Sequence, residues 1–297
     1  MEAFLPRLYV LVAPLFVVLW STGFIGAKLG LPHAEAMSFL SIRFFLTTLA
    51  LLAWVMVARA PWPTPRQAVS AALIGVMVHG IYLGGVFQAI AWGVEAGVSA
   101  LIVGLQPVVT ALIAHRFLGE RLNRVQTLGM VFGTMGVALV VLRKLDAGIG
   151  DWGGVMLCIL SLLAISVGAV LQKTRAADTP MRSGNLIQFA AACTFTAILA
   201  ALFETREIDW TPSFAFALGW LVIVLSLGAI TLLYVLIQRG GASNVASLFF
   251  LVPPSTALFA WFLFDERLGP PELAGMAVAA LGVLMVNRPQ SFQRKAD

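Results

Sequence analysis

Ten long apolar stretches, separated by short polar connections, organise the chain of 297 residues. Each is close to the roughly 20 residues that a helix needs to cross about 30 Å of hydrocarbon, although the fifth and tenth are short. The pattern predicts an all-α integral membrane protein with ten transmembrane helices. The approximate bounds of the stretches are 8–28, 36–58, 67–92, 96–117, 125–142, 152–173, 183–203, 214–238, 243–264 and 272–287.

The fourth and fifth stretches are repeated near the end of the chain. Residues 96–142 align without a gap to residues 242–288, and about 16 of the 47 aligned positions are identical. Pro107 aligns with Pro253, and each copy carries a Glu-Arg-Leu triplet about a dozen residues further on. A helical hairpin with a proline in its first helix is therefore used twice.

A fainter match extends the repeat to the earlier helices, since Lys28 aligns with Lys173 at an offset of 145. We expect two five-helix repeats, residues 1–145 and 146–297, the second including a short cytoplasmic C-terminal tail. Because five is an odd number, the second repeat enters the membrane from the opposite side, and the two copies are inverted. Inverted repeats suit a transporter, because exchanging the conformations of the halves opens the protein to either side.

The composition excludes a soluble globular protein. The chain is 60% hydrophobic and 11% charged, whereas soluble domains are about a quarter charged. The short connections leave no room for an ATP-binding module or a catalytic head. Cys158 and Cys193 both lie in apolar stretches, so we interpret them as small buried hydrophobes and expect no disulfide, metal site or cofactor.

The distribution of basic residues predicts the orientation. With a cytoplasmic N-terminus, about 13 Lys and Arg side chains lie inside and about 5 outside, which is the positive-inside pattern. Both termini are then cytoplasmic, and in a bacterium the protein lies in the inner membrane. The basic residues are spread over the loops rather than gathered in a patch, so the net charge of +5 does not indicate a nucleic-acid partner.

Several motifs resemble a known family. The first helix carries Trp-Ser-Thr-Gly-Phe at 20–24, and the repeated hairpins turn at Leu-Gly-Glu-Arg-Leu, 118–122, and Phe-Asp-Glu-Arg-Leu, 264–268. The chain resembles the EamA-type branch of the drug/metabolite transporter superfamily and, within it, most the YddG-type amino-acid exporters. This resemblance implies a central cavity among helices 1, 3, 4, 6, 8 and 9, with a small molecule as the transported partner.

Polar side chains inside the apolar stretches are the candidates for that cavity, because such groups are costly in hydrocarbon and normally face a bundle interior. His79 and Tyr82 share one helix face, as do Ser99 and Gln106. Polar groups also recur at matching positions of the two halves. The predicted substrate-binding residues are Trp20, Ser21, His79, Tyr82, Gln88, Ser99, Gln106, Gln172, Tyr234, Gln238 and Asn244.

Each candidate also has a structural interpretation. Serine and threonine hydroxyls often bond to helix backbones or join neighbouring helices, and Trp20 could simply pack. Arg43 is the one permanent charge well inside a stretch; we expect it to bond to helix-end carbonyls or a lipid headgroup, with an anion ligand as the alternative. Lys28 and Lys173 are expected to snorkel toward the membrane surface or to guard an entrance.

Prolines and glycines suggest where helices bend and pack. Pro107 and Pro253 each remove a backbone hydrogen bond and predict either a hinge or a static kink. Glycine-spaced fifth and tenth helices predict a close helix contact, either within one chain or in a homodimer.

The sequence indicates a transporter that exports small metabolites, above all amino acids with broad selectivity, by alternating access. Aromatic walls tolerate varied side chains while polar groups hold the shared backbone atoms. A proton-coupled multidrug exporter and an intramembrane enzyme are the alternatives.

No Asp or Glu lies near the centre of a stretch, and His79 is the one deep titratable group. Facilitated diffusion or exchange is therefore expected. Glu120 and Glu266 are expected to cap or brace helix ends.

Overall fold

The computed structural model describes residues 5–119, 122–146, 148, 151–229, 232, 236 and 248–286, except the side chains of residues 5–11 and 250. Its secondary structure consists of helices, joined by short connections, and one isolated bridge between Ala34 and Ile208. The helices of the first half are α1 (Leu5–Gly30), η1 (Leu31–His33), α2 (Ala36–Val57), α3 (Pro65–Gly75), η2 (Val76–Ile81), α4 (Tyr82–Ala91), α5 (Ala96–Val103), α6 (Gln106–Leu118) and α7 (Arg124–Asp146). Those of the second half are α8 (Trp152–Arg175), α9 (Met181–Phe203), α10 (Pro212–Gly219), η3 (Trp220–Ala229), η4 (Phe249–Leu251), α13 (Val252–Phe264) and α14 (Pro270–Val286).

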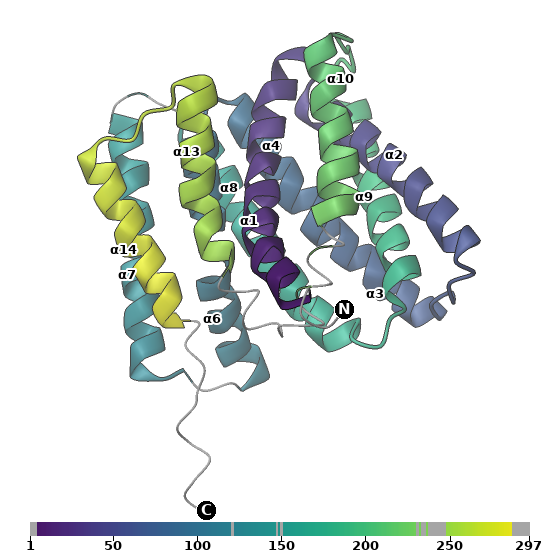
Figure 1. Cartoon of the computed structure of the whole chain (residues 1–297), viewed down its shortest axis with the longest axis horizontal. Coiled ribbons are helices and arrows are strands. Elements are labelled where there is room, and N and C mark those ends of the chain that lie inside the picture. The colour runs from purple at the N-terminus through teal and green to yellow at the C-terminus, as the bar shows by residue number, and fades with distance from the viewer. Residues whose placement is uncertain are drawn as a thin grey trace, which may run out of the picture.

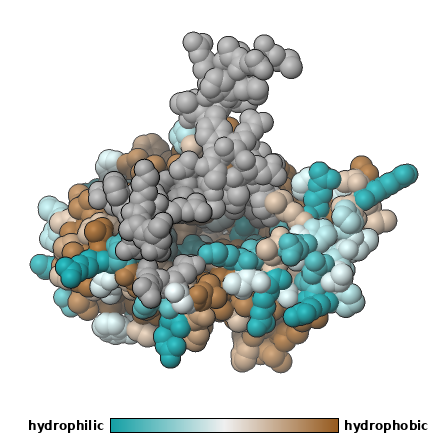
Figure 2. All heavy atoms as spheres, turned by 90° about the horizontal axis from the view of Figure 1, so that it is seen from below, coloured by the Kyte–Doolittle hydropathy of each residue, from teal (hydrophilic) through white to brown (hydrophobic). Residues whose placement is uncertain are grey.

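Eight helical segments of the described chain are long and apolar enough to cross a membrane, and α13 and α14 are shorter apolar helices. The predicted all-α membrane protein with ten transmembrane helices is confirmed. Many large apolar side chains point outward, such as Phe262, which is 81% exposed. Figure 2 shows hydrophilic residues around the rim of the molecule seen from below, with hydrophobic residues between them.

Corresponding helices of the two halves pack against each other in opposite directions. The fifth helix of each half, α7 and α14, lie side by side at the left of Figure 1. A Cβ at Gly129 would lie 2.5 Å from the Gly282 carbonyl oxygen, and a Cβ at Gly136 would lie 2.4 Å from that of Gly275. Because the earlier residue of α7 meets the later residue of α14, the helices are antiparallel. The glycines face each other inside one chain, so they are explained by the close packing of these two helices.

The second helices of the two halves, α2 and α9, show the same inversion at the right of Figure 1. Ser38 at the start of α2 bonds to Glu204 just after α9, at 2.7 Å, and Ser41 lies 3.2 Å from Thr196, about two turns earlier in α9. The repeats are therefore inverted, as the odd number of helices predicts.

The fourth transmembrane segment is two helices rather than one kinked helix. Helix α5 ends at Val103 and α6 begins at Gln106, because Pro107 has no N–H to continue the α5 hydrogen bonds. The break lies between Ser99 and Gln106, and both residues contact α8, at Cys158 and Ser166. The fifth segment was also expected to be short, yet α7 has 23 residues.

The third segment of each half contains a π-helical turn. Residues of η2 and η3 occupy equivalent positions, since Val76–Ile81 falls inside Trp220–Ala229 when shifted by 146. A π turn widens the helix by one residue and often marks a functional position. The repeat therefore preserves a local distortion as well as the helices.

Candidate functional site

Arg43 joins the two halves of the protein near their π turns. Its side chain leaves α2, and the residue is only 6% exposed. The guanidinium donates from Nε and Nη2 to the Ser226 hydroxyl on η3, at 3.3 and 3.2 Å. Ser226 in turn donates to the Leu221 carbonyl five residues earlier, at 3.0 Å. The expected bonds from Arg43 to helix-end carbonyls are replaced by this bond to a hydroxyl.

His79 lies in the π turn η2, beside Arg43. Its ring stacks on Phe189 of α9, with centroids 4.2 Å apart and planes 18° apart, and Phe44 lies 6.1 Å away. Tyr82, the first residue of α4, is buried. Both His79 and Tyr82 are within electrostatic range of the Arg43 guanidinium. The structure thus brings two predicted site residues together with a third, Arg43, for which sequence reasoning favoured a structural role.

Ser226 and the two phenylalanine rings were missed by sequence reasoning. Phenylalanines are too common in apolar stretches to stand out, and Ser226 is one of several hydroxyls in hydrocarbon. The conflict between a permanent charge and an apolar stretch was the available signal. It identified Arg43 but not its partner on another helix.

Trp20 belongs to a separate aromatic cluster. Its ring lies 5.3 Å from Phe16 and 5.1 Å from Phe249, the second contact being edge to face. Packing accounts for these contacts.

Ser21 connects α1 to the proline break of α13. The hydroxyl lies 2.8 Å from the Val17 carbonyl oxygen and 3.3 Å from that of Val252, directly before Pro253. The residue is fully buried, so this bond between helices accounts for the hydroxyl.

Ser166, which is 145 positions after Ser21, makes the same pair of contacts in the other half. Its hydroxyl lies 2.7 Å from the Leu162 carbonyl oxygen and 3.5 Å from that of Gln106, directly before Pro107. Each half therefore ties its first helix to the proline break of the opposite half. Sequence reasoning missed Ser166, although the repeat position of Ser21 pointed to it.

The other predicted residues are dispersed. Ser99 is buried beside Cys158, with Oγ and Sγ 3.6 Å apart. Gln172 is exposed and accepts a hydrogen bond from Gln188 at 3.0 Å. Gln106 is half-buried at the start of α6. The candidates Tyr234, Gln238 and Asn244, with Thr231 and Ser247, lie outside the described residues.

Gln88 lines a cavity of about 1060 Å³ at the end of the molecule where α1 ends and α2 begins. Carboxylates around this cavity form hydrogen bonds that connect the segments lining it. Glu204 accepts hydrogen bonds of 2.7 Å from the N–H groups of Met37 and Ser38 and so caps α2. The Thr205 hydroxyl, aided by nearby N–H groups, lowers the pKa of Glu35 below its usual range.

Ion pairs close the same end nearer to α13. Glu266 is buried, pairs with Lys28 and accepts hydrogen bonds from the first N–H groups of α5, Ala96 at 3.1 Å and Gly97 at 3.4 Å. The prediction that Glu266 caps a helix end is confirmed. Lys28, which we expect to snorkel or to guard an entrance, has this buried carboxylate as its partner. Glu120 lies outside the described residues.

A second pair lies beside the first. Lys144, at the end of α7, binds Glu95 at 2.8 Å and the Arg267 carbonyl oxygen at 2.6 Å. Burial raises the pKa of Glu95 above its usual range, although Lys144 opposes this shift.

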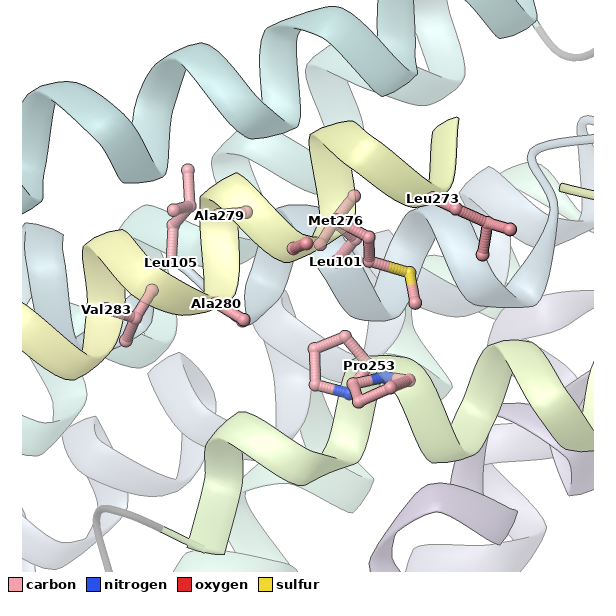
Figure 3. Close-up of a pocket in the computed structure, with 11 residues that line it drawn as sticks. Leu101, Leu105, Pro253, Leu273, Met276, Ala279, Ala280 and Val283 are labelled. Carbon is pink, nitrogen blue, oxygen red and sulfur yellow. The ribbon is translucent and has the colours of Figure 1, made fainter. Parts of the chain in front are cut away.

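A small apolar cavity of about 230 Å³ lies where the two broken segments approach α14. It is lined by Gly104 and Leu105 from the first break and by Pro253 and Pro254 from the second, with Met276 and Ala280 of α14 opposite (Figure 3). The lining offers almost no polar atoms, so it does not suit a zwitterion.

Comparison with known proteins places this geometry in context. The EamA-like transporter family matches the chain twice, over residues 7–142 and 152–288. The uncharacterized transporter YvbV of Bacillus subtilis is 26% identical over 286 residues, covering 94% of this chain and 92% of that protein. The uncharacterized inner membrane transporter YedA of Escherichia coli is 23% identical over 271 residues, covering 91% and 87%.

A probable terminal-alkyne amino-acid exporter of Streptantibioticus cattleyicolor is 26% identical over 290 residues, covering 95% of this chain and 94% of that protein. One solved structure, described as "Crystal structure of protein", aligns with a TM-score of 0.64 at 19% identity, covering 93% and 94% of the two chains. At that identity the structural likeness shows the fold alone.

Proposed function

Because the chain belongs to the EamA-like transporter family, we propose that it exports amino acids with varied side chains by alternating access between its two inverted repeats. The family resemblance predicted from the hairpin motifs is confirmed. The chain is a multi-pass membrane transporter, and a small molecule is its partner. Amino acids as the substrate, export as the direction and the absence of catalysis are our proposals.

The grouping of His79, Tyr82 and Arg43 between aromatic rings carries the proposal. Hydrogen-bonding groups are needed to hold the ammonium and carboxylate that all amino acids share, while Phe44 and Phe189 tolerate different side chains. The polar groups come from the first repeat, and Phe189 brings the second repeat into contact with them, so the grouping lies where the two repeats meet. The exporter of Streptantibioticus cattleyicolor, an amino-acid exporter by its description, supports this substrate class.

Reconstituted protein tests the substrate class. Proteoliposomes preloaded with unlabelled amino acids should accumulate labelled amino acids by exchange, across several side-chain types. His79→Ala and Tyr82→Ala should each lower the exchange rate by about tenfold or more, because each removes a group from the site. Thr134→Ala is the matched control, since Thr134 is exposed on α7 and bonds only to its own helix at Met130. Unchanged exchange by both site variants would remove them from the substrate pathway.

Energy coupling is tested in the same vesicles. We propose facilitated diffusion or exchange, because no carboxylate lies deep in an apolar stretch. A pH gradient imposed without a substrate gradient should then drive no accumulation. Accumulation that His79→Gln abolishes would identify a proton antiporter instead, and transport of lipophilic cations in place of amino acids would favour the multidrug alternative.

We further propose that the protein lies in a bacterial inner membrane with both termini cytoplasmic, from the excess of basic residues on that side. A reporter that functions only in the cytoplasm should be active when it is fused to either terminus.

A further inference from the structure

Arg43 carries a permanent charge that no carboxylate of the described residues neutralises. Arginine stays protonated in proteins, and this one is 94% buried within a membrane-spanning helix. No Asp or Glu among the described residues lies within ion-pair distance of it. None of the 14 acidic residues of the sequence lies near the centre of an apolar stretch, since Glu272 is the first residue of the tenth. A bound ligand with a negative charge would therefore find an unpaired cation at this point of the described structure.

The bonds of Arg43 leave much of its binding capacity unused. A guanidinium has five N–H donors arranged as a fork that matches the two oxygens of a carboxylate. Here Nε and Nη2 both donate to a single oxygen, that of Ser226. The Ser226 proton is already directed to Leu221, so the hydroxyl serves Arg43 as a neutral acceptor. A neutral acceptor compensates a buried charge much less well than a carboxylate.

The repeat gives an independent reason to assign a ligand. The residue 145 positions after Arg43 is Gln188, which is 7% exposed and bonds to Gln172 within its own half. Gln188 shows that a neutral amide suffices at this position of the fold. A charge at one of two equivalent positions is expected where a single ligand binds off the symmetry axis.

We propose that Arg43 binds the carboxylate of the transported substrate, which replaces the Ser226 hydroxyl as the acceptor from Nε and Nη2. His79 and Tyr82 then border the rest of the ligand. The substrate class is narrowed to compounds with a free carboxylate, and amines of the same shape are rejected. This inference rests on the proposed transport function and assigns one end of its substrate.

Three probes that share one aromatic ring test the proposal. Phenylalanine has both charged groups, 3-phenylpropionate has only the carboxylate, and phenethylamine has only the ammonium. Binding is measured by ligand-induced thermal shift of the purified full chain, and transport by exchange in proteoliposomes. The wild type should bind both acids more tightly than the amine by about tenfold or more, the range for a hydrogen-bonded charge.

Two variants separate binding from folding. Arg43→Gln, which installs the residue of the equivalent position, should weaken both acids by about tenfold or more and leave the amine unchanged. Ser226→Ala should keep or tighten acid binding, because it removes the competing hydroxyl and leaves the charge. If Arg43→Gln fails to fold, Ser226→Ala still decides: loss of acid binding in this variant overturns the proposal. Equal weakening of all three probes by Arg43→Gln also overturns it.

Two further outcomes are informative. One distinguishes a lipid headgroup from the substrate as the ligand of Arg43, and the other distinguishes the carboxylate site from the amino-acid transport function. Vesicles with and without phosphatidylglycerol test an anionic headgroup as the ligand. If Arg43→Gln abolishes stabilisation by phosphatidylglycerol while phenylalanine binding persists, the headgroup is the ligand and the proposal is wrong. If the wild type exchanges no amino acid but still discriminates 3-phenylpropionate from phenethylamine through Arg43, the carboxylate site stands and the amino-acid function fails.

Discussion

The two halves of the protein are alike at their proline breaks and unlike at Arg43. Ser21 and Ser166 reach the carbonyls of Val252 and Gln106 in the same way, each across to the opposite half. At the position of Arg43 the second half has a glutamine, whose partner lies within that half. The two repeats have thus kept the bonds between helices at the proline breaks, whereas the polar side chains at the position of Arg43 differ.

The π turns repeat this lesson on a smaller scale. Both halves have the turn at equivalent places, yet the side chains on it differ. His79 corresponds to Leu225, and Ser226 corresponds to Gly80. The two halves thus share a distortion of the backbone and place different side chains on it, as the proposed asymmetric site requires.

The largest expected effect is at Glu266, and it tests whether the two halves are also alike at their helix ends. Glu266→Gln should lower the free energy of unfolding by about 3 kcal/mol, because it leaves Lys28 without its buried partner and weakens the cap of α5. Thermal denaturation in detergent measures this loss, and substrate affinity should change much less. If Glu120 has the same role in the first half, Glu120→Gln should lower the free energy of unfolding by a similar amount.

Asp265→Asn is the matched control for Glu266→Gln. Asp265 pairs with Arg267 at 2.9 Å, but both side chains are more than 70% exposed. Such surface pairs contribute about 0–1 kcal/mol. A control variant as unstable as Glu266→Gln would show that the turn, and not the buried pair, holds this end together.

A smaller effect is expected at the proline breaks. Ser21→Ala and Ser166→Ala should each lower stability by about 1 kcal/mol, the usual contribution of one hydrogen bond, and should slow exchange to the same extent. Denaturation and proteoliposome exchange measure the two quantities. Unequal effects on exchange would mean that the two breaks differ in function in spite of their matching bonds.

The smallest effect contrasts two carboxylates near the same end of the molecule. The pKa of Glu35 is lowered, so its contribution to stability is present above pH 4.5 and is lost as the pH falls through its folded-state pKa. The pKa of Glu95 is raised by burial, so its contribution is present below pH 4.5 and is lost as the pH rises through the folded-state pKa.

Glu35→Gln and Glu95→Gln should therefore change the pH dependence of thermal stability in opposite directions, each by less than about 1 kcal/mol because both groups are partly solvated. Melting curves of the wild type and both variants from acid to neutral pH give the two slopes. Slopes of the same sign would contradict the assigned environments.

Hydrophobic stretches and the internal repeat sufficed to predict the helices and their inversion, because both depend on patterns that one chain displays. The break between α5 and α6 could be placed only near Pro107, since the exact ends depend on which carbonyls find partners. Among the site candidates, His79 and Tyr82 were predicted from their helical spacing, and the structure places both near Arg43. Ser21 was not separable from them, because a serine that binds substrate and one that joins two helices look the same in a sequence.

Long-range partners explain the remaining differences. Lys28 and Glu266 are 238 residues apart, and nothing local to Lys28 shows that a carboxylate will reach it. Likewise, the charge of Arg43 is evident in the sequence, whereas its bond to Ser226 depends on the docking of η3 against α2. Such pairings follow from tertiary packing, which single-chain patterns do not encode.

Exchanging the conformations of the two halves would leave the number of serine-to-carbonyl bonds at the proline breaks unchanged. The inward-open and outward-open states can then differ in free energy only through positions where the repeats differ, such as Arg43 and Gln188. A difference of about 1.4 kcal/mol shifts such an equilibrium tenfold, so a few non-equivalent residues suffice to set the resting population. Single substitutions at such positions can therefore change which of the two states the empty transporter prefers, while the serine-to-carbonyl bonds stay intact.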